Sequence, residues 1–414
     1  MKEINQPSKA QSKFFYGYII VAATFIIQVV MFGPSHGFGV FFKPLIAEFG
    51  WSRALISGAF SLSVIVQGMS GVVMGGLNDR LGPRLVLTLC GVFLGLGYLL
   101  MSQINAAWQL YLFYVVVIGV GMGGVYVPQL STVARWFVKR RSVMTGVVLA
   151  GGGLGGVIVP PVVTWLITAY GWRNSYLVLA VVVFAIIVLA SQFLRRDPAQ
   201  MGRVPYGENQ VERPDLKLVD EGLTLREAVG TGRFWMTIAM VFCFGYCVMT
   251  STVHIVPHAT DLGISPASAA AMLAVISATN PIGGLVLGSV ADRIGNRRVY
   301  IICFILLTLA LVWLFNATEA WKLYLFAFVF GIGAGGNATS TSPLVAELFG
   351  MRAHGLILGV IFSCMMLGGA TGPFLAGYIF DVSGSYHLAF LITTAIGFCG
   401  LVLAVALRPM KKLG

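Results

Sequence analysis

Two amide side chains and two carboxylates recur at matched spacing in this sequence. Gln67 and Asn280 each stand twelve residues before the aspartate of a G-x-x-x-D-R-x-G-x-R segment, Asp79 and Asp292 respectively. In a helix, twelve residues span about 18 Å, so each amide would lie near the middle of a bilayer that the helix crosses. Because an amide both donates and accepts hydrogen bonds, a facing pair is suited to bind a carboxyl or hydroxyl group. The alternative is that each amide only joins neighbouring helices.

Four further residues are candidates for contact with a solute. Gln28 lies at mid-depth in the first apolar run, and Tyr126 and Asn337 follow the glycine runs of the fourth and tenth. His36 is the one ionisable side chain expected well inside a cavity-facing helix, and imidazole changes charge near neutral pH. His36 is therefore a candidate to relay a proton or to pair transiently with an anion. Packing, gating or a hydrogen-bonded structural role is the alternative for all four.

Other kinds of chemistry find no support in the sequence. No apolar run carries a nucleophile with a matching base, paired carboxylates or metal ligands at a recognisable spacing, and no nucleotide-binding loop is present. Cys243 and Cys247 share a helix face, but without further ligands we interpret them as small apolar residues. We therefore predict a protein that is not an enzyme and that uses no metal or cofactor.

The elements that must position these residues are long apolar helices. Of the 414 residues, 57% are hydrophobic and 10% are charged, whereas a soluble domain has about 25% charged residues. Since a segment that crosses the bilayer must satisfy its own backbone hydrogen bonds, we predict an all-α polytopic membrane protein with twelve transmembrane helices. The spans are expected near residues 16–41, 54–76, 86–103, 108–134, 143–168, 174–194, 234–257, 266–289, 299–316, 322–346, 355–380 and 387–407.

The basic residues predict how these spans are oriented. The net charge is +12, but Lys and Arg are spread over short loops, which argues against a nucleic-acid partner. Of the 27 Lys and Arg residues, only Lys43, Arg53, Arg173 and Lys322 fall on the side opposite the N-terminus. By the positive-inside rule, we expect a protein of the cell membrane with both termini in the cytoplasm.

The chain repeats itself after 213 residues. The segment from Gly75 to Arg84 recurs as Gly288 to Arg297, and residues 107–113 recur as residues 320–326. A repeat that contains six spans predicts two pseudo-symmetric six-helix bundles of the same orientation, with a cavity between them near the midplane.

The repeat and the loop composition together predict the domain boundaries. We expect an N-terminal bundle over 1–194, a cytoplasmic linker over 195–233, which is rich in charge and proline, and a C-terminal bundle over 234–414. Small residues allow helices to approach closely, so we expect two glycine runs to form surfaces between the halves. These runs are Gly151, Gly152, Gly153, Gly155 and Gly156, and Gly368, Gly369 and Gly372.

The doubled G-x-x-x-D-R-x-G-x-R segment resembles the signature of the major facilitator superfamily. Two copies at matching positions extend this resemblance over the whole chain. The resemblance implies a secondary transporter whose cytoplasmic ends are locked by these loops, each aspartate facing a helix N-terminus, where a carboxylate is favoured. The gate residues that it implies are Asp79, Arg80, Arg84, Asp292, Arg293 and Arg297.

Residues 39–53, 135–151 and 256–265 resemble bacterial monocarboxylate porters and oxalate/formate antiporters. The eighth helix of that branch typically reads N-x-x-G-R, and its arginine reaches a substrate carboxylate, whereas this sequence has Gly284 in that place. We expect a small organic acid such as lactate to move with a proton by alternating access, because a protonated acid needs no arginine. A neutral or amphipathic solute is the alternative. The expected partners are this solute, a proton and the lipid bilayer, and the expected functional unit is a monomer.

Overall fold

The computed structural model describes residues 15–207 and 222–407, without the side chains of residues 35–37, 53–54 and 266. The first half contains α1 (Gly17–His36), the 3₁₀ turn η1 (Gly37–Phe41), α2 (Phe42–Phe49), α3 (Arg53–Leu81), α4 (Pro83–Met101), α5 (Ala107–Leu110), the π-helix η2 (Tyr111–Ile118), α6 (Gly119–Trp136), α7 (Arg141–Ser191) and η3 (Pro198–Met201). The second half contains α8 (Leu225–Val229), α9 (Gly232–Asp261), α10 (Pro266–Ile294), α11 (Asn296–Leu314), α12 (Ala320–Phe349), α13 (His354–Ser383) and α14 (His387–Ala406).

The helix α7 accounts for two of the predicted spans. Its 51 residues would extend about 76 Å as a straight helix, more than twice the hydrocarbon thickness of a bilayer. Gly171 interrupts it with φ 80° and ψ 162°, a conformation that glycine adopts without steric cost. The predicted spans 143–168 and 174–194 lie on either side of this break. Ten further helical segments are long and apolar enough to cross a membrane, so the described residues contain the twelve predicted spans.

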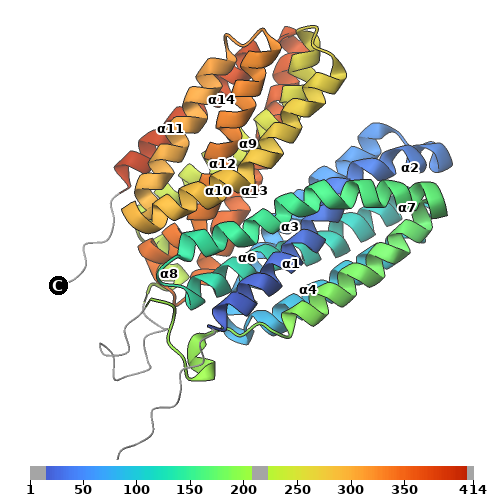
Figure 1. Ribbon diagram of the computed structural model, residues 1–414. Coiled ribbons are helices and arrows are strands. Elements are labelled where there is room, and N and C mark those ends of the chain that lie inside the picture. The colour runs from blue at the N-terminus through green and yellow to red at the C-terminus, as the bar shows by residue number, and fades with distance from the viewer. Residues whose placement is uncertain (1–14, 208–221, 408–414) are drawn as a thin grey trace, which may run out of the picture.

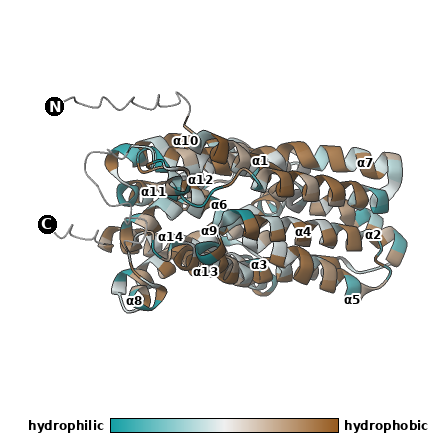
Figure 2. Ribbon diagram, turned by 90° about the horizontal axis from the view of Figure 1, so that it is seen from below, coloured by the Kyte–Doolittle hydropathy of each residue, from teal (hydrophilic) through white to brown (hydrophobic). Residues whose placement is uncertain are grey.

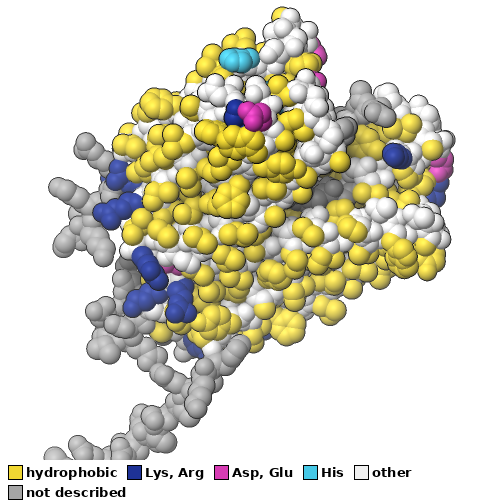
Figure 3. All heavy atoms as spheres, turned by 45° about the horizontal axis from the view of Figure 1, so that its top comes forward, with side chains coloured by type: hydrophobic (Ala, Val, Ile, Leu, Met, Phe, Trp, Pro, Cys, Tyr) yellow, Lys and Arg dark blue, Asp and Glu magenta, His cyan; other side chains and the backbone are white. Residues whose placement is uncertain are grey.

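The helices form two bundles that meet at one end. Figure 1 shows α1–α7 in one bundle and α9–α14 in the other, with long axes that diverge away from the end at which α8 lies. Figure 2 shows α8 and α2 at opposite ends of the molecule. Lys and Arg gather at one end, and hydrophobic side chains cover the flanks (Figure 3). We call this end, which carries the turns at 80–84, 137–141 and 293–298, the basic end.

The glycine runs of α7 and α13 pack mainly inside their own bundles. A Cβ at Gly151 would lie 2.5 Å from the carbonyl oxygen of Phe25 on α1, and one at Gly368 would overlap the carbonyl of Phe242 on α9. Gly153 does face the other bundle, where a Cβ would lie 2.6 Å from Pro281. The prediction that these runs lie between the halves is therefore wrong for most of their members, because a run of small residues indicates close packing but not which helix is the partner.

Candidate transport pathway

Contacts between the bundles pair α3 with α13 and α7 with α10. A Cβ at Gly359 on α13 would lie 2.6 Å from the carbonyl oxygen of Gly71 on α3, and one at Gly146 on α7 would lie 2.9 Å from that of Gly284 on α10. Glycine at these positions lets two backbones touch across the molecule. These contacts lie in the halves of the four helices that are nearer the basic end.

The face of α10 that touches α7 continues beyond this contact but is no longer covered. Gly288, Gly284 and Pro281 follow the spacing of one helical stripe, and each lies against α7. The same stripe continues through Ser277 and Ala270, which are both exposed. The side of α10 that faces the other bundle is therefore uncovered in its half farther from the basic end.

The helix α3 shows the same change along its length. Gly75, Gly71 and Gly68 lie against α13, and Ser61 and Ser57 continue their stripe and are exposed. The faces that the two bundles turn toward each other are thus uncovered at the end of the molecule that lies opposite the basic end. We call this uncovered region the opening, and hydroxyl groups line it. Sequence reasoning missed Ser57, Ser61 and Ser277, although their spacing from the glycines that touch the other bundle is a signal that could have found them.

The two predicted amides lie at equal depth on α3 and α10. Asn280 lies about 21 Å from the end of α10 along the helix, as Gln67 does on α3. Both side chains are half-buried, and neither makes a hydrogen bond with another described residue. The structure therefore leaves both amides available to a solute, but it brings them into no contact with each other.

The other predicted solute contacts lie elsewhere. Gln28 and Asn337 are fully buried inside their own bundles, and both polar atoms of each side chain lack a hydrogen-bond partner among the described residues. His36 is the last residue of α1, and its side chain lies outside the described residues. In this conformation Gln28 and Asn337 therefore do not face the opening.

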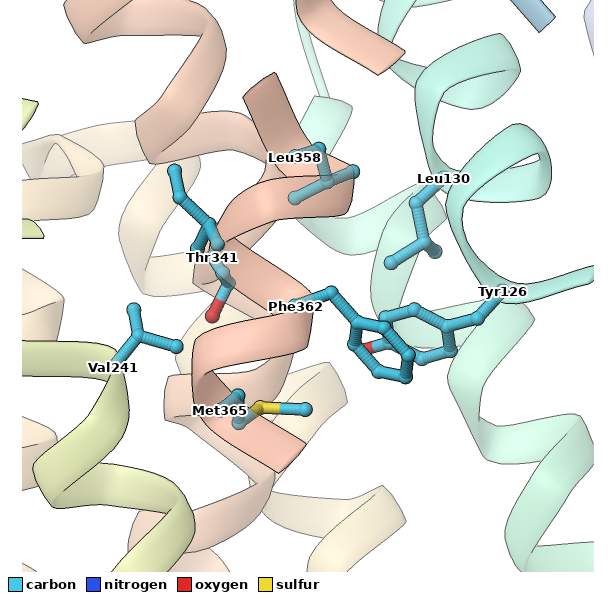
Figure 4. A pocket seen from close by; sticks show the side chains of 8 residues that line it. Tyr126, Leu130, Val241, Thr341, Leu358, Phe362 and Met365 are labelled. Atoms are coloured by element: carbon cyan, nitrogen blue, oxygen red, sulfur yellow. The ribbon is translucent and has the colours of Figure 1, made fainter. Parts of the chain in front are cut away.

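Tyr126 and Phe362 form an apolar contact between the opening and the basic end, which we call the plug. The ring of Tyr126 stacks on that of Phe362 from the opposite bundle, with centroids 4.5 Å apart and planes inclined by 21°. Figure 4 shows this pair beside a small pocket, into which Thr341 and Val241 also point. The hydroxyl of Thr341 is 2.7 Å from that of Tyr300. This plug would separate a solute in the opening from the basic end.

Two contacts between an aspartate and a helix N-terminus join the bundles at the basic end, and we call them latches. The first latch joins Asp79 of α3 to the start of α13. The carboxylate accepts hydrogen bonds from the backbone N–H groups of Gly355 and Leu356, at 3.1 and 2.8 Å. Arg135 lies 3.4 Å from the same carboxylate, is 5% exposed, and donates to the carbonyl of Met351 at 2.8 Å. A carboxylate at a helix N-terminus is stabilised by the helix dipole, so this contact holds the two bundles together.

The second latch is the repeat of the first with the bundles exchanged. The carboxylate of Asp292 on α10 accepts hydrogen bonds from the backbone N–H groups of Ser142 and Val143 at the start of α7, at 2.9 and 3.1 Å. The hydroxyl of Ser142 also donates to Asn296 at 2.9 Å. The sequence predicted that each of these aspartates faces a helix N-terminus, but not which helix supplies it.

The four predicted gate arginines do not bridge the bundles. Arg80 and Arg293 are exposed. Arg84 donates to Gln192 at 2.8 Å and Arg297 to the carbonyl of Val405 at 2.5 Å, in each case within one bundle. Arg135, which the gate motif does not contain, does act across the bundles through its bond to the carbonyl of Met351.

Position 284 lies at the contact between α7 and α10. A Cβ there would lie 2.7 Å from the hydroxyl of Thr339, and the carbonyl of Gly284 faces Gly146. A larger side chain in this place would require at least the Thr339 side chain on α12 to shift. The glycine that replaces the usual arginine is therefore part of the closed contact between the bundles.

Two like-oriented six-helix bundles, latched at one end and uncovered at the other, define a carrier-type membrane transporter. The family model of the Major Facilitator Superfamily matches residues 22–277 and 252–413. The chain belongs to this superfamily and is a transporter, not an enzyme.

Named relatives and solved structures are similar over nearly the whole chain. Monocarboxylate transporter 13 of Rattus norvegicus is 26% identical over 93% of this chain and 87% of its own length. The oxalate:formate antiporter of Oxalobacter formigenes is 24% identical over 99% of this chain and 97% of its own length. The proton:xylose symporter XylE shares the fold with a TM-score of 0.77 at 12% identity, over 96% of this chain and 97% of that structure. The monocarboxylate transporter and the oxalate:formate antiporter identify the predicted branch of the superfamily, and the symporter structure shows the fold.

Proposed function

We propose that this transporter carries a small organic acid, such as a monocarboxylate together with a proton, by alternating access. The alternating-access part depends on one observation: the latches and glycine contacts lie toward the basic end, while the same faces of α3 and α10 are uncovered farther along. A rocking motion that broke both latches and closed the opposite opening would expose a central site to the other side.

We place the basic end in the cytoplasm, with both termini on that side. The excess of Lys and Arg in the turns of this end supports the assignment through the positive-inside rule. In the proposed arrangement residues 195–233 link a bundle over 1–194 to one over 234–414, and Asp79 and Asp292 act as the cytoplasmic gate.

Two observations support an organic acid as the solute. The relatives include proteins named monocarboxylate transporters and an oxalate:formate antiporter. Asn280 and Gln67 are half-buried amides whose side chains have no hydrogen-bond partner in the described part of the chain, and such groups can bind a carboxyl group. Because a buried carboxylate is costly without a cation, the absence of an arginine at position 284 favours an acid that crosses in its protonated form.

A neutral or weakly amphipathic solute is the second candidate. Gly284 and the exposed hydroxyl groups of Ser57, Ser61 and Ser277 favour it, because none of these positions carries a charge that would select an anion. Stabilisation of the purified protein against heat by neutral compounds, and not by carboxylates, would support this candidate.

The test is uptake of labelled L-lactate into proteoliposomes with and without an inward proton gradient. We expect gradient-driven accumulation that Asn280→Ala reduces at least tenfold, since the variant loses a hydrogen bond to the solute. Asn316→Ala is the matched control, because Asn316 is an exposed amide in a turn at the opposite end from the latches and should leave uptake unchanged. Folded protein that takes up no monocarboxylate under either condition would overturn the organic-acid proposal.

A further inference from the structure

His354 is a fully buried histidine at the interface between the two bundles. It is the first residue of α13, directly before the backbone N–H groups that bind Asp79. Its Nδ1 lies 3.2 Å from the hydroxyl of Ser131 on α6 of the opposite bundle, and its Nε2 lies 3.1 Å from the carbonyl oxygen of Ser342 on α12. Its side chain is 0% exposed. The Ser131 contact exists only while the bundles are closed at this end, whereas Ser342 belongs to the same bundle as His354.

These contacts assign the tautomer of the neutral His354 ring in the closed form, and the charges around it disfavour a protonated ring. A carbonyl oxygen can only accept, so Nε2 carries the hydrogen, and Nδ1 accepts from the hydroxyl of Ser131 in the neutral ring. The charged groups around the ring are Arg135 of α6, Arg141 of α7 and Asp79 of α3. The Asp79 carboxylate is already occupied by two N–H groups and by Arg135. A second positive charge on the ring would therefore be buried beside two guanidinium groups without a carboxylate partner of its own.

We propose that His354 binds a proton when the basic end opens and so couples the pH on that side to the opening of the transporter. The proposal rests on the alternating-access cycle proposed above. Separation of the bundles removes the partner hydroxyl of Ser131 and exposes the ring to water. The closed form holds the neutral ring, and the open form holds either the neutral or the protonated ring.

The direction of the effect follows from proton linkage. The open form binds more protons than the closed form, so acid shifts the equilibrium toward the open form. An exposed imidazole titrates near pH 6.5, and below that pH each unit can raise the open-to-closed ratio up to tenfold. With the basic end in the cytoplasm, an acidified cytoplasm would hold the transporter open to the cytoplasm, ready to load an acid for export.

The test measures the distance between the two bundles and does not depend on the solute. Spin labels at Lys139→Cys, in the exposed turn before α7, and Arg298→Cys, at an exposed position in the first turn of α11, lie on opposite bundles at the basic end. Double electron–electron resonance of the full chain in lipid nanodiscs, with the native cysteines replaced, reports the open-to-closed ratio. From pH 7.5 to 5.5 we expect this ratio to rise roughly tenfold. His354→Gln should abolish the rise, since glutamine can accept from Ser131 and donate to Ser342 but does not titrate.

Two further variants separate this role from a structural one. His387→Gln removes an exposed histidine at the opposite end and should leave the pH response unchanged. Ser131→Ala should raise the open fraction at every pH and retain the pH response, because His354 is still present. A pH response that persists in His354→Gln, or a wild-type ratio that does not vary with pH, would overturn the proposal and leave alternating access standing. Labels that never separate would overturn alternating access as well.

Discussion

The two latches at the basic end have the same backbone geometry but different surroundings. In each, an aspartate of one bundle accepts two N–H hydrogen bonds from the first turn of a helix in the other. The latch at Asp79 is shielded from water, because Arg135 and His354 beside it are buried, and we call it the dry latch. The latch at Asp292 is open to water, because this aspartate and the neighbouring Glu347 are exposed. The duplication has thus kept the contact between carboxylate and helix terminus but not the way in which its charge is balanced.

The repeat itself locates this difference. With the one-residue slip between the fourth and tenth spans, Arg135 corresponds to Glu347, and Arg141 corresponds to His354. The first latch therefore has its cation in the bundle that supplies the aspartate, and a neutral histidine faces it. The second latch has a second carboxylate in that place, and Arg141 faces it from the other bundle. We infer that the dry latch contributes most of the free energy that keeps the basic end closed.

Of the substitutions considered, Asp79→Asn should raise the open-to-closed ratio most. The amide places an NH₂ group among donors and leaves Arg135 buried with Asp197, at 3.3 Å, as its one remaining carboxylate partner among the described residues. We expect the closed form to lose about 3 kcal/mol, or on the order of a 100-fold increase in the open-to-closed ratio. The label pair on the turns of the basic end measures this ratio, and a change below threefold would contradict the importance of the dry latch.

Asp292→Asn should have a clearly smaller effect. The exposed carboxylate is screened by water and salt, so we expect about 1 kcal/mol, or roughly a fivefold increase in the open-to-closed ratio. The effect should decrease in 0.5 M salt, whereas that of Asp79→Asn should change little. The double variant should be close to additive, because the latches share no side chain. An effect equal to that of Asp79→Asn would show that burial does not distinguish the latches.

Glu227→Gln, near the linker, should change the open-to-closed ratio least. It separates the pH response of His354 from a general sensitivity of the protein to acid. The backbone N–H of Thr224 donates to the Glu227 carboxylate at 2.7 Å and lowers the pKa of Glu227 below its usual value of 4.5. Its stabilisation of α8 is thus present above about pH 4.5 and is lost as the pH falls through the lowered pKa. The hydrogen-exchange protection factors of the α8 amides, which correct for the intrinsic pH dependence of exchange, should fall only in that acidic range. Glu227→Gln should remove this fall. A transition near pH 6 in these amides would contradict the assignment.

Much of the architecture could be predicted from the sequence, because it depends on local patterns. The spans follow from apolar runs of bilayer length, and the positions of Asp79 and Asp292 follow from a motif that occurs twice. The partners of the glycine runs could not be predicted, since spacing defines a helix face but not the helix that covers it. Close packing of α1 on Gly151 and of α9 on Gly368 is a property of the assembled bundles.

The candidate site depends on the conformation of the transporter, which no local pattern encodes. Ser61 and Ser277 are exposed only because the bundles are apart at their level. Conversely, His354 is buried because the bundles are together at its level. The correspondence of His354 with Arg141 in the repeat was the available signal, since it puts a titratable ring where the other half has a permanent cation.

The hydroxyl-lined opening has a consequence for the speed of solute capture. The stripes on α3 and α10 carry small, uncharged side chains, including Ser61, Ala270 and Ser277. The described side chains of these stripes therefore offer little for long-range electrostatic steering of an anion to act on. In the proposed function, such an entrance would admit a weak acid and its neutral analogue with similar ease, and discrimination between them would fall to Asn280 and Gln67.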